Sequence, residues 1–274
     1  MLAMPLWIAV LLGIVEGVTE FLPISSTGHL IVAASILGVH DEKGKVFEIA
    51  IQTGAIFAVI WVYRQRFWGA ARGVASDPRA QRFWLNLAIA FMPLAVLGLL
   101  FQKAIKSVLF NPLGVAAASI VGALIIFYVE RDGRREVPAR INSVDEMGAM
   151  DALKCGIAQA FALFPGMSRS GSSIVGGMLF GLSRQAATEF SFFLGVPTLI
   201  AGGLYSLYKE RALLSVADVP AFLVGGGVSF LVALLVIKTL IRYVASNTLK
   251  PFAWYRIVFG LLILFMAKQG LLHL

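Results

Sequence analysis

Long runs of apolar residues constrain this chain more than any other feature. Ten apolar segments divide its 274 residues, and they cover residues 4–22, 28–38, 46–63, 83–101, 112–129, 149–164, 172–183, 187–208, 217–237 and 252–267. A helix needs about 20 residues to cross a bilayer. Six segments approach that length, the second and seventh are too short, and polar residues interrupt the first and sixth, which end at Pro23 and Pro165. The order is therefore two short, three long, two short and three long.

The composition supports a membrane protein and excludes several other classes. Hydrophobic residues make up 59% and charged residues 14% of the chain, against about 45–50% and about 25% in an ordinary soluble domain. Such a chain is neither an ordinary soluble enzyme nor disordered. The net charge of +8 comes from basic residues in short loops between apolar runs, so membrane topology accounts for it and no nucleic-acid partner is expected. The single cysteine, Cys155, excludes an internal disulfide.

An internal repeat follows from a comparison of the two halves at a constant offset. A shift of 143 residues aligns shared glycine, phenylalanine and serine positions, which are Gly13 with Gly156, Phe21 with Phe164, Ser25 with Ser168 and Gly28 with Gly171. This predicts one membrane domain, 1–274, with repeats at approximately 4–129 and 149–267; chance similarity between apolar segments is the alternative. If each short pair is a re-entrant hairpin, each repeat crosses the membrane three times and the second repeat is inverted. The expected fold is an all-α polytopic membrane protein with about six transmembrane helices and two re-entrant helical hairpins.

Basic residues in the loops predict the orientation. Twelve of them follow the third, fifth and ninth segments: Arg64, Arg66, Arg72, Arg79, Arg82, Arg131, Arg134, Arg135, Arg140, Lys238, Arg242 and Lys250. The opposite side carries seven. The side richer in Lys and Arg faces the cytoplasm, so both termini are expected on the external side. The first hairpin then enters from outside and the second from the cytoplasm, and their tips are expected to meet near the middle of the membrane.

The first predicted tip holds acidic, hydroxyl and imidazole groups next to apolar segments. Its sequence is EGVTEFLPISSTGH, residues 16–29. Glu16 and Glu20 are four residues apart and share one helix face, and Pro23 ends that helix before the SSTGH turn. A charge at bilayer depth costs roughly 2.5–3.5 kcal/mol on insertion scales, so these groups indicate a site. The alternative is an interfacial helix end with its charges in water.

The second predicted tip, PGMSRSGSS at residues 165–173, is rich in hydroxyl groups and contains one arginine. Serines and free backbone N–H groups before a helix form an anion site, and the planar guanidinium of Arg169 suits phosphate oxygens. The positive ends of both outgoing half-helices would point at one spot, which predicts a phosphate or diphosphate site. A surface turn is the alternative, because SRSGSS is also ordinary loop composition.

The two tips together closely resemble the two signature motifs of the bacterial undecaprenyl-diphosphate phosphatases of the bacitracin-resistance type, and the resemblance covers nearly the whole chain. It implies hydrolysis of undecaprenyl diphosphate to undecaprenyl phosphate and phosphate, which recycles the lipid carrier for peptidoglycan synthesis. It also implies a location in the bacterial inner membrane, an active site that faces the periplasm, and a divalent cation, Mg²⁺ or Ca²⁺.

The residue types suggest a role for each candidate. Arg169 is expected to clamp the diphosphate and to neutralise charge in the transition state. The hydroxyl groups expected to donate hydrogen bonds to the phosphate oxygens are those of Thr27, Ser168, Ser170 and Ser173. Glu16 and Glu20 can hold a divalent cation through hard oxygen ligands, and Glu20 is alternatively a base.

Ser26 is the candidate nucleophile, activated by His29 or by a glutamate. His29 titrates near neutral pH and suits a general acid or base. Direct attack by water stays open. Glu48, Gln52 and Glu189 are either polar neighbours of the site or residues that pack between helices.

A transporter is the rival interpretation, because inverted repeats with polar tips at the midplane are typical of secondary transporters. A flippase for a polyprenyl phosphate would need the same anion site. Hydrolysis is favoured because the first tip combines carboxylates, a histidine and a serine, which is more chemistry than binding requires. The expected partners are an isoprenoid diphosphate and membrane lipids, and a homodimer is left open.

Overall fold

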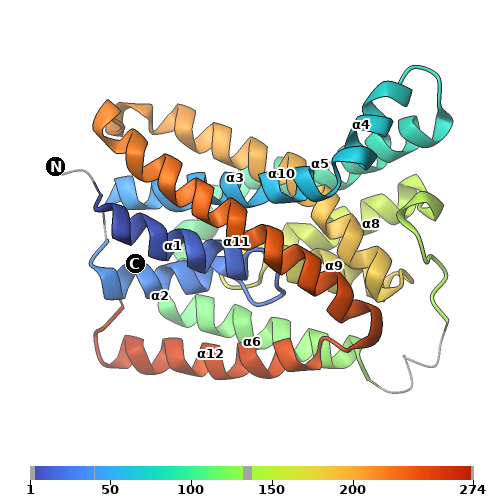
Figure 1. The fold of residues 1–274 in the computed structure, drawn as a ribbon. Coiled ribbons are helices and arrows are strands. Elements are labelled where there is room, and N and C mark those ends of the chain that lie inside the picture. The colour runs from blue at the N-terminus through green and yellow to red at the C-terminus, as the bar shows by residue number, and fades with distance from the viewer. Residues whose placement is uncertain (1–3, 40, 132–137, 273–274) are drawn as a thin grey trace.

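The computed structural model describes residues 4–39, 41–131 and 138–272. This part of the chain is mostly helical and contains no strand, only an isolated bridge between Ile141 and Leu182. The helices in chain order are α1 (Leu6–Thr19), α2 (Ser26–Leu37), α3 (Glu42–Val62), α4 (Arg64–Gly73), α5 (Pro78–Leu109), α6 (Pro112–Val129), η1 (Val144–Glu146), α8 (Ala149–Ala160), η2 (Phe161–Leu163), α9 (Arg169–Leu179), α10 (Arg184–Lys209), η3 (Arg211–Leu213), η4 (Val216–Asp218), α11 (Val219–Ser246) and α12 (Lys250–Lys268). The predicted all-α class is confirmed (Figure 1).

Six of the described helices are long and apolar enough to cross a membrane: α3, α5, α6, α10, α11 and α12. They coincide with the six long apolar segments of the sequence. The other four segments form α1, α2, α8 and α9, which have 14, 12, 12 and 11 residues and fall short of the about 20 residues that a span needs. The protein is therefore a multi-pass α-helical membrane protein.

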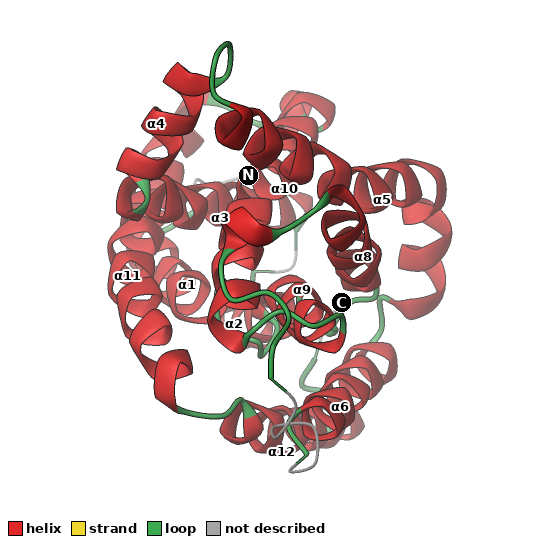
Figure 2. Cartoon of the chain, turned by 90° about the vertical axis from the view of Figure 1, so that its right-hand side faces the viewer, coloured by secondary structure: helices red, strands yellow, loops and turns green. Residues whose placement is uncertain are grey.

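The four short helices form two hairpins that enter the bundle from opposite ends (Figure 1). The α1–α2 hairpin comes from one end and the α8–α9 hairpin from the other, and α2 and α9 lie in the interior, surrounded by the other helices (Figure 2). Helix α1 packs on α11, and α8 packs on α5, so each hairpin is held by a long helix from the other half of the chain. Helix α3 packs on α10, and α6 on α12. These contacts map onto one another when the two halves are exchanged, as expected for an inverted repeat; the repeat itself stays a prediction.

One glycine in each hairpin allows this close packing. A Cβ atom on Gly13 of α1 would lie 2.6 Å from the carbonyl oxygen of Gly225 on α11. A Cβ atom on Gly156 of α8 would overlap the carbonyl oxygen of Ala90 on α5. Gly13 and Gly156 are a pair in the alignment of the two halves. Small residues let helix backbones approach each other where lipid supplies no hydrophobic driving force, so these two positions fix the short helices in the bundle.

Both tips turn on a serine with a positive φ. Ser25 has φ 74° and ψ 93°, and Ser168 has φ 73° and ψ 119°; in the described part of the chain they are the non-glycine residues with positive φ. Such a conformation costs a residue with a Cβ atom about 1–3 kcal/mol. Each serine sets the direction of the half-helix that follows, which begins at Ser26 in α2 and at Arg169 in α9.

Helix α4 corrects one expectation, because the region after the third apolar segment was predicted as a loop. A search for apolar segments does not find this helix, because it contains several basic residues. Its Arg, Gln and Ala residues nevertheless favour a helix. Arg66 of α4 donates hydrogen bonds to both carboxylate oxygens of Asp145 in η1, and these bonds hold the pKa of Asp145 below its ordinary value. Two of the twelve loop cations used for the orientation, Arg134 and Arg135, lie outside the described residues.

Candidate active site

The two hairpin tips are bonded to each other. Ser170 Oγ at the second tip donates a hydrogen bond of 2.9 Å to the carbonyl oxygen of Leu22 at the first tip. Arg169 donates from Nε and Nη2 to Oε1 of Glu20, over distances of 3.2 and 2.8 Å. The prediction that the tips meet is confirmed, and the ion pair joins residues 149 positions apart in the chain.

Glu20 bonds to Ser26 at the first tip as well as to Arg169 at the second. Its second oxygen, Oε2, accepts a hydrogen bond of 2.6 Å from Ser26 Oγ. The exposed fractions of Glu20 and Ser26 are 5% and 7%, so little water competes for these bonds. Arg169 makes one further bond, from Nη1 to the carbonyl oxygen of Ser191 at 3.0 Å. A guanidinium has five N–H groups, so one N–H on each terminal nitrogen of Arg169 has no partner among the described residues and can bind an anion.

The ring of His29 contacts helix α12. Its Nδ1 is 2.7 Å from the carbonyl oxygen of Ser25, and its Nε2 is 2.6 Å from the hydroxyl of Tyr255 on α12. A carbonyl only accepts, so Nδ1 donates to Ser25, whereas the Tyr255 hydroxyl can either donate to Nε2 or accept from it. The ring also stacks on Phe259, with 3.9 Å between centroids. The sequence left open whether His29 or a glutamate activates Ser26. In the structure Ser26 bonds to Glu20, and His29 lies against α12.

The serines of the second tip have protein partners. Ser168 Oγ accepts from the backbone N–H of Gly171 at 3.0 Å and caps α9. The single hydroxyl proton of Ser170 is directed to Leu22. Ser173 Oγ lies 3.0 Å from the carbonyl oxygen of Arg169 and 2.7 Å from Ser191 Oγ. These hydroxyl groups hold the tip together, so they are already engaged before any phosphate binds; Thr27, by contrast, lines a cavity.

The first turns of the two half-helices differ in their capping. Ser168 caps α9, but Ser25 at the equivalent position before α2 makes no side-chain cap bond. The buried Oγ of Ser25 has no partner among the described residues. Helix N-termini with free N–H groups bind phosphate. The sequence predicted that the positive ends of both half-helices would point at one spot; the missing side-chain cap leaves more free N–H groups at the start of α2 than at the start of α9.

The second acidic residue of the first tip is Glu16. It is fully buried, and neither of its carboxylate oxygens has a hydrogen-bond partner in the described part of the chain. It lies one helical turn before Glu20 on the same face of α1. An uncompensated buried carboxylate is unfavourable, so these oxygens fit a hard cation or a proton. Within the described residues, no group of three or more His, Cys, Asp or Glu side chains lies close enough together to hold a metal ion.

A cavity of about 700 Å³ leads toward the first tip. Thr27, the residue after Ser26, lines it together with Glu48 and Gln52 of α3. Charged side chains at the start of α3 and the end of α10, including Lys45 and Lys209, also line it. The cavity therefore connects one end of the bundle with the neighbourhood of Ser26, and it gives Glu48 and Gln52 a place beside the site. Glu189 of α10 does not line this cavity.

Sequence reasoning missed the buried arginine that contacts both tips. Arg256 of α12 is 1% exposed and donates hydrogen bonds to backbone carbonyls at both tips. The signal was present in the sequence, because Arg256 interrupts the last apolar segment as Glu16 and Glu20 interrupt the first. Tyr255 and Ser191, which contact His29 and Arg169, carry no comparable signal.

The fold and the site define an integral membrane protein with a buried centre of carboxylate, hydroxyl and guanidinium groups where two hairpin tips meet. The chain belongs to the bacitracin resistance protein BacA family, and the model of that family matches residues 9–262.

Several relatives with the name undecaprenyl-diphosphatase match almost the full chain. One from Dechloromonas aromatica is 58% identical over 256 residues, which is 93% of this chain and 92% of the relative. One from a Polaromonas species is 57% identical, and one from Acidovorax ebreus is 56% identical, each over 263 residues, 96% of this chain and 95% of the relative. The resemblance noted in the tip motifs is thus confirmed across the chain.

Proposed function

We propose that the protein is an integral membrane phosphatase that hydrolyses undecaprenyl diphosphate to undecaprenyl phosphate and phosphate. Membership of the BacA family and identities of 56–58% to proteins named undecaprenyl-diphosphatase support this assignment. The reaction recycles the lipid carrier for peptidoglycan synthesis. Within the chain, the observation that carries the proposal is that Glu20, the base, accepts hydrogen bonds from both Ser26, the nucleophile, and Arg169, the anion clamp.

Ser26 is the proposed nucleophile and Glu20 its base. A bond forms between Ser26 Oγ and the terminal phosphorus, while the bond from that phosphorus to the bridging oxygen breaks. Undecaprenyl phosphate leaves with the bridging oxygen. The proton of Ser26 passes to Oε2 of Glu20, which already accepts its hydrogen bond. Water then cleaves the phosphoserine, so that Ser26 regains a proton and phosphate is released.

Arg169 and the N-terminus of α2 bind the terminal phosphate in this proposal. Arg169 keeps two N–H groups for phosphate oxygens while its other three hold Glu20 and the Ser191 carbonyl. The open first turn of α2 adds backbone N–H groups on the side of Ser26. Donors fixed in advance and aimed at developing negative charge stabilise a phosphoryl-transfer transition state.

A divalent cation, Mg²⁺ or Ca²⁺, belongs to the proposal. Glu16 and Glu20 would hold it, and the partnerless oxygens of Glu16 fit a hard cation. Mg²⁺ commonly binds through one or two carboxylates together with substrate phosphates, which agrees with a site of two glutamates. When bound, the cation would supply charge neutralisation at the phosphate oxygens.

The proposal also includes the orientation in the membrane. The cavity opens where α3 begins and α10 ends, at the same end of the bundle as the first and last described residues (Figure 1). Because the excess of basic loop residues is predicted at the opposite end, we assign the cavity, the site and both termini to the periplasmic side. The homodimer stays a prediction.

Phosphate release from purified protein in detergent tests this function. With an isoprenoid diphosphate as substrate, the native chain is expected to release phosphate and Ser26→Ala to lose this activity. Ser76→Ala, an equivalent change in an exposed loop, is the matched control. A phosphoserine trapped at Ser26 by acid quenching and identified by mass spectrometry would support the covalent route.

Two results would contradict parts of the proposal. Full turnover in Ser26→Ala would replace the covalent route by direct attack of water. The absence of phosphate release in detergent, together with lipid phosphate movement across sealed vesicles, would favour the flippase alternative, because transport needs a sealed membrane and hydrolysis does not.

A further inference from the structure

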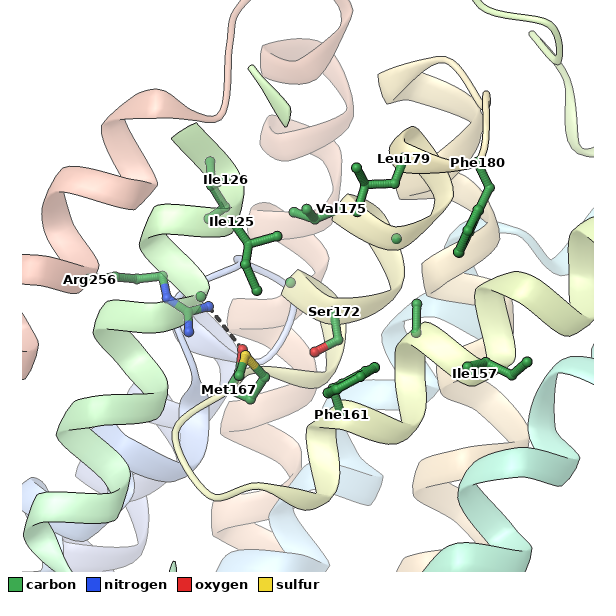
Figure 3. Close-up of a pocket in the computed structure, with 14 residues that line it drawn as sticks. Ile125, Ile126, Ile157, Phe161, Met167, Ser172, Val175, Leu179, Phe180 and Arg256 are labelled. Atoms are coloured by element: carbon green, nitrogen blue, oxygen red, sulfur yellow. Dashed lines mark hydrogen bonds between the residues drawn. The ribbon is translucent and has the colours of Figure 1, made fainter. Parts of the chain in front are cut away.

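Arg256 connects both hairpin tips to a membrane-spanning helix. Its guanidinium lies near the tips, where it forms part of the wall of a cavity of about 350 Å³ (Figure 3). Its donors reach five backbone carbonyls, with distances of 2.9 Å to Ser119, 3.1 Å to Ala118, 3.2 Å to Pro23, 3.0 Å to Met167 and 3.1 Å to Gly166. Two of these carbonyls belong to α6, one to the first tip and two to the second.

All hydrogen-bonding capacity of Arg256 is used within the protein. Nε donates once, and Nη1 and Nη2 donate twice each, which accounts for the five N–H groups of a guanidinium. Arg169 differs, because two of its N–H groups remain for an anion. Arg256 therefore has no donor left for a phosphate, although it is a buried arginine beside the site.

The bonded carbonyls lie directly before the proposed catalytic groups. Pro23 precedes Ser26 by three residues, and Met167 precedes Arg169 by two. Nη1 of Arg256 donates to both of these carbonyls, so a single nitrogen atom ties the segment that carries Ser26 to the segment that carries Arg169. Bonds of Nε and Nη2 to α6 fix this nitrogen relative to the bundle.

Two glycines leave the space that the guanidinium of Arg256 occupies. A Cβ atom on Gly122 of α6 would overlap Nη2 of Arg256, and a Cβ atom on Gly171 of α9 would lie 3.2 Å from Nη1. Glycine at position 122 is thus needed for the arginine to reach the tips. Arg256 can consequently be disturbed in two independent ways, by replacing it or by adding a methyl group at Gly122.

We propose that Arg256 is a positioning residue for hydrolysis, which holds the two hairpin tips in the register that places Ser26 against Glu20 and Arg169. This inference rests on the proposed roles of those three residues. Arg256 contacts no reacting atom and acts through the carbonyls of Pro23, Gly166 and Met167. Its loss would leave buried carbonyls unpaired and free the tips to move relative to each other.

Kinetics of Arg256→Lys and Arg256→Met in detergent test the proposal. A misplacement of about 1 Å can lower the rate about 10²-fold, so kcat per folded molecule is expected to fall by that order in Arg256→Met, with a much smaller change in KM. Lysine has three donors, so Arg256→Lys should give an intermediate kcat. The matched control is Arg184→Met, which removes a half-buried arginine that holds Glu130 at the C-terminal end of α6.

Gly122→Ala keeps the proposal testable if Arg256→Met does not fold, because it retains the arginine and displaces it. Its kcat should also fall while KM changes little. Native kcat per folded molecule in both Arg256→Lys and Gly122→Ala would overturn the proposal, as would an equal loss of kcat in Arg184→Met. Ser26→Ala measured in the same series separates the two claims: turnover retained there counts against the catalytic assignment, whatever the Arg256 variants show.

Discussion

Ser26 Oγ lies 2.6 Å from Oε2 of Glu20 and donates a hydrogen bond to that oxygen. The other oxygen of the same carboxylate accepts two bonds from Arg169. The carboxylate is therefore held on both sides and cannot rotate without breaking one of these contacts. Glu20 differs in this respect from Glu16, whose oxygens have no such partners among the described residues.

Glu20→Gln should lose most of its turnover and keep its fold. The amide has nearly the shape of the carboxylate but does not take up the Ser26 proton, and general base catalysis contributes about 10²–10⁴-fold to a rate. We expect kcat to fall within that range when phosphate release is measured at saturating substrate. Glu146→Gln, at an exposed position, is the control for loss of a carboxylate. Native turnover in Glu20→Gln would exclude Glu20 as the base.

The positions of the tips could be predicted because they follow from local rules. A bilayer penalises unpaired charge, so the few charges inside apolar segments had to be paired or functional, and Glu20 and Arg169 form an ion pair. Proline and glycine end helices, which located the turns. The alignment of Ser25 with Ser168 predicted equivalent positions, and both residues adopt a positive φ.

The choice of partners inside the site could not be predicted in the same way. His29 follows Ser26 by three residues, yet its ring bonds to Tyr255, 226 positions away. The hydroxyl of Ser170 is a group that could bind phosphate, but it donates to the carbonyl oxygen of Leu22 at the other tip. Side-chain direction at a turn depends on the long-range packing around it, and residue spacing within one motif carries no information about that packing.

Glu16→Gln should weaken the affinity of the site for the divalent cation that supports activity. A neutral amide is a poorer ligand for a hard cation than a carboxylate, so the Mg²⁺ concentration for half-maximal phosphate release should rise. Stability should not fall, since the change removes a buried carboxylate that lacks a partner. Glu48→Gln, in the cavity wall, provides the comparison. An unchanged Mg²⁺ requirement in Glu16→Gln, or an equal change in both variants, would argue against a cation at Glu16.

Alanine at the two turn serines should affect stability unequally. Ser168→Ala removes the cap on Gly171, and loss of an N-cap typically costs about 0.5–2 kcal/mol. Ser25→Ala breaks no hydrogen bond made by the side chain, because Ser25 Oγ has no partner among the described residues, so its cost should be smaller. Reversible unfolding in mixed micelles measures both free energies of unfolding. Equal losses, or a larger loss for Ser25→Ala, would contradict the difference in capping.

Cysteine labelling in intact cells should locate the mouth of the cavity. The native Cys155 is buried, and Cys155→Ser gives a background without thiols. In that background, Lys209→Cys at the cavity should react with a membrane-impermeant maleimide added from outside. Arg79→Cys, also exposed and at the start of α5, should react only after the membrane is permeabilised, because this end of the helix carries the basic residues typical of the cytoplasmic side. The reverse pattern would place the cavity and Ser26 toward the cytoplasm.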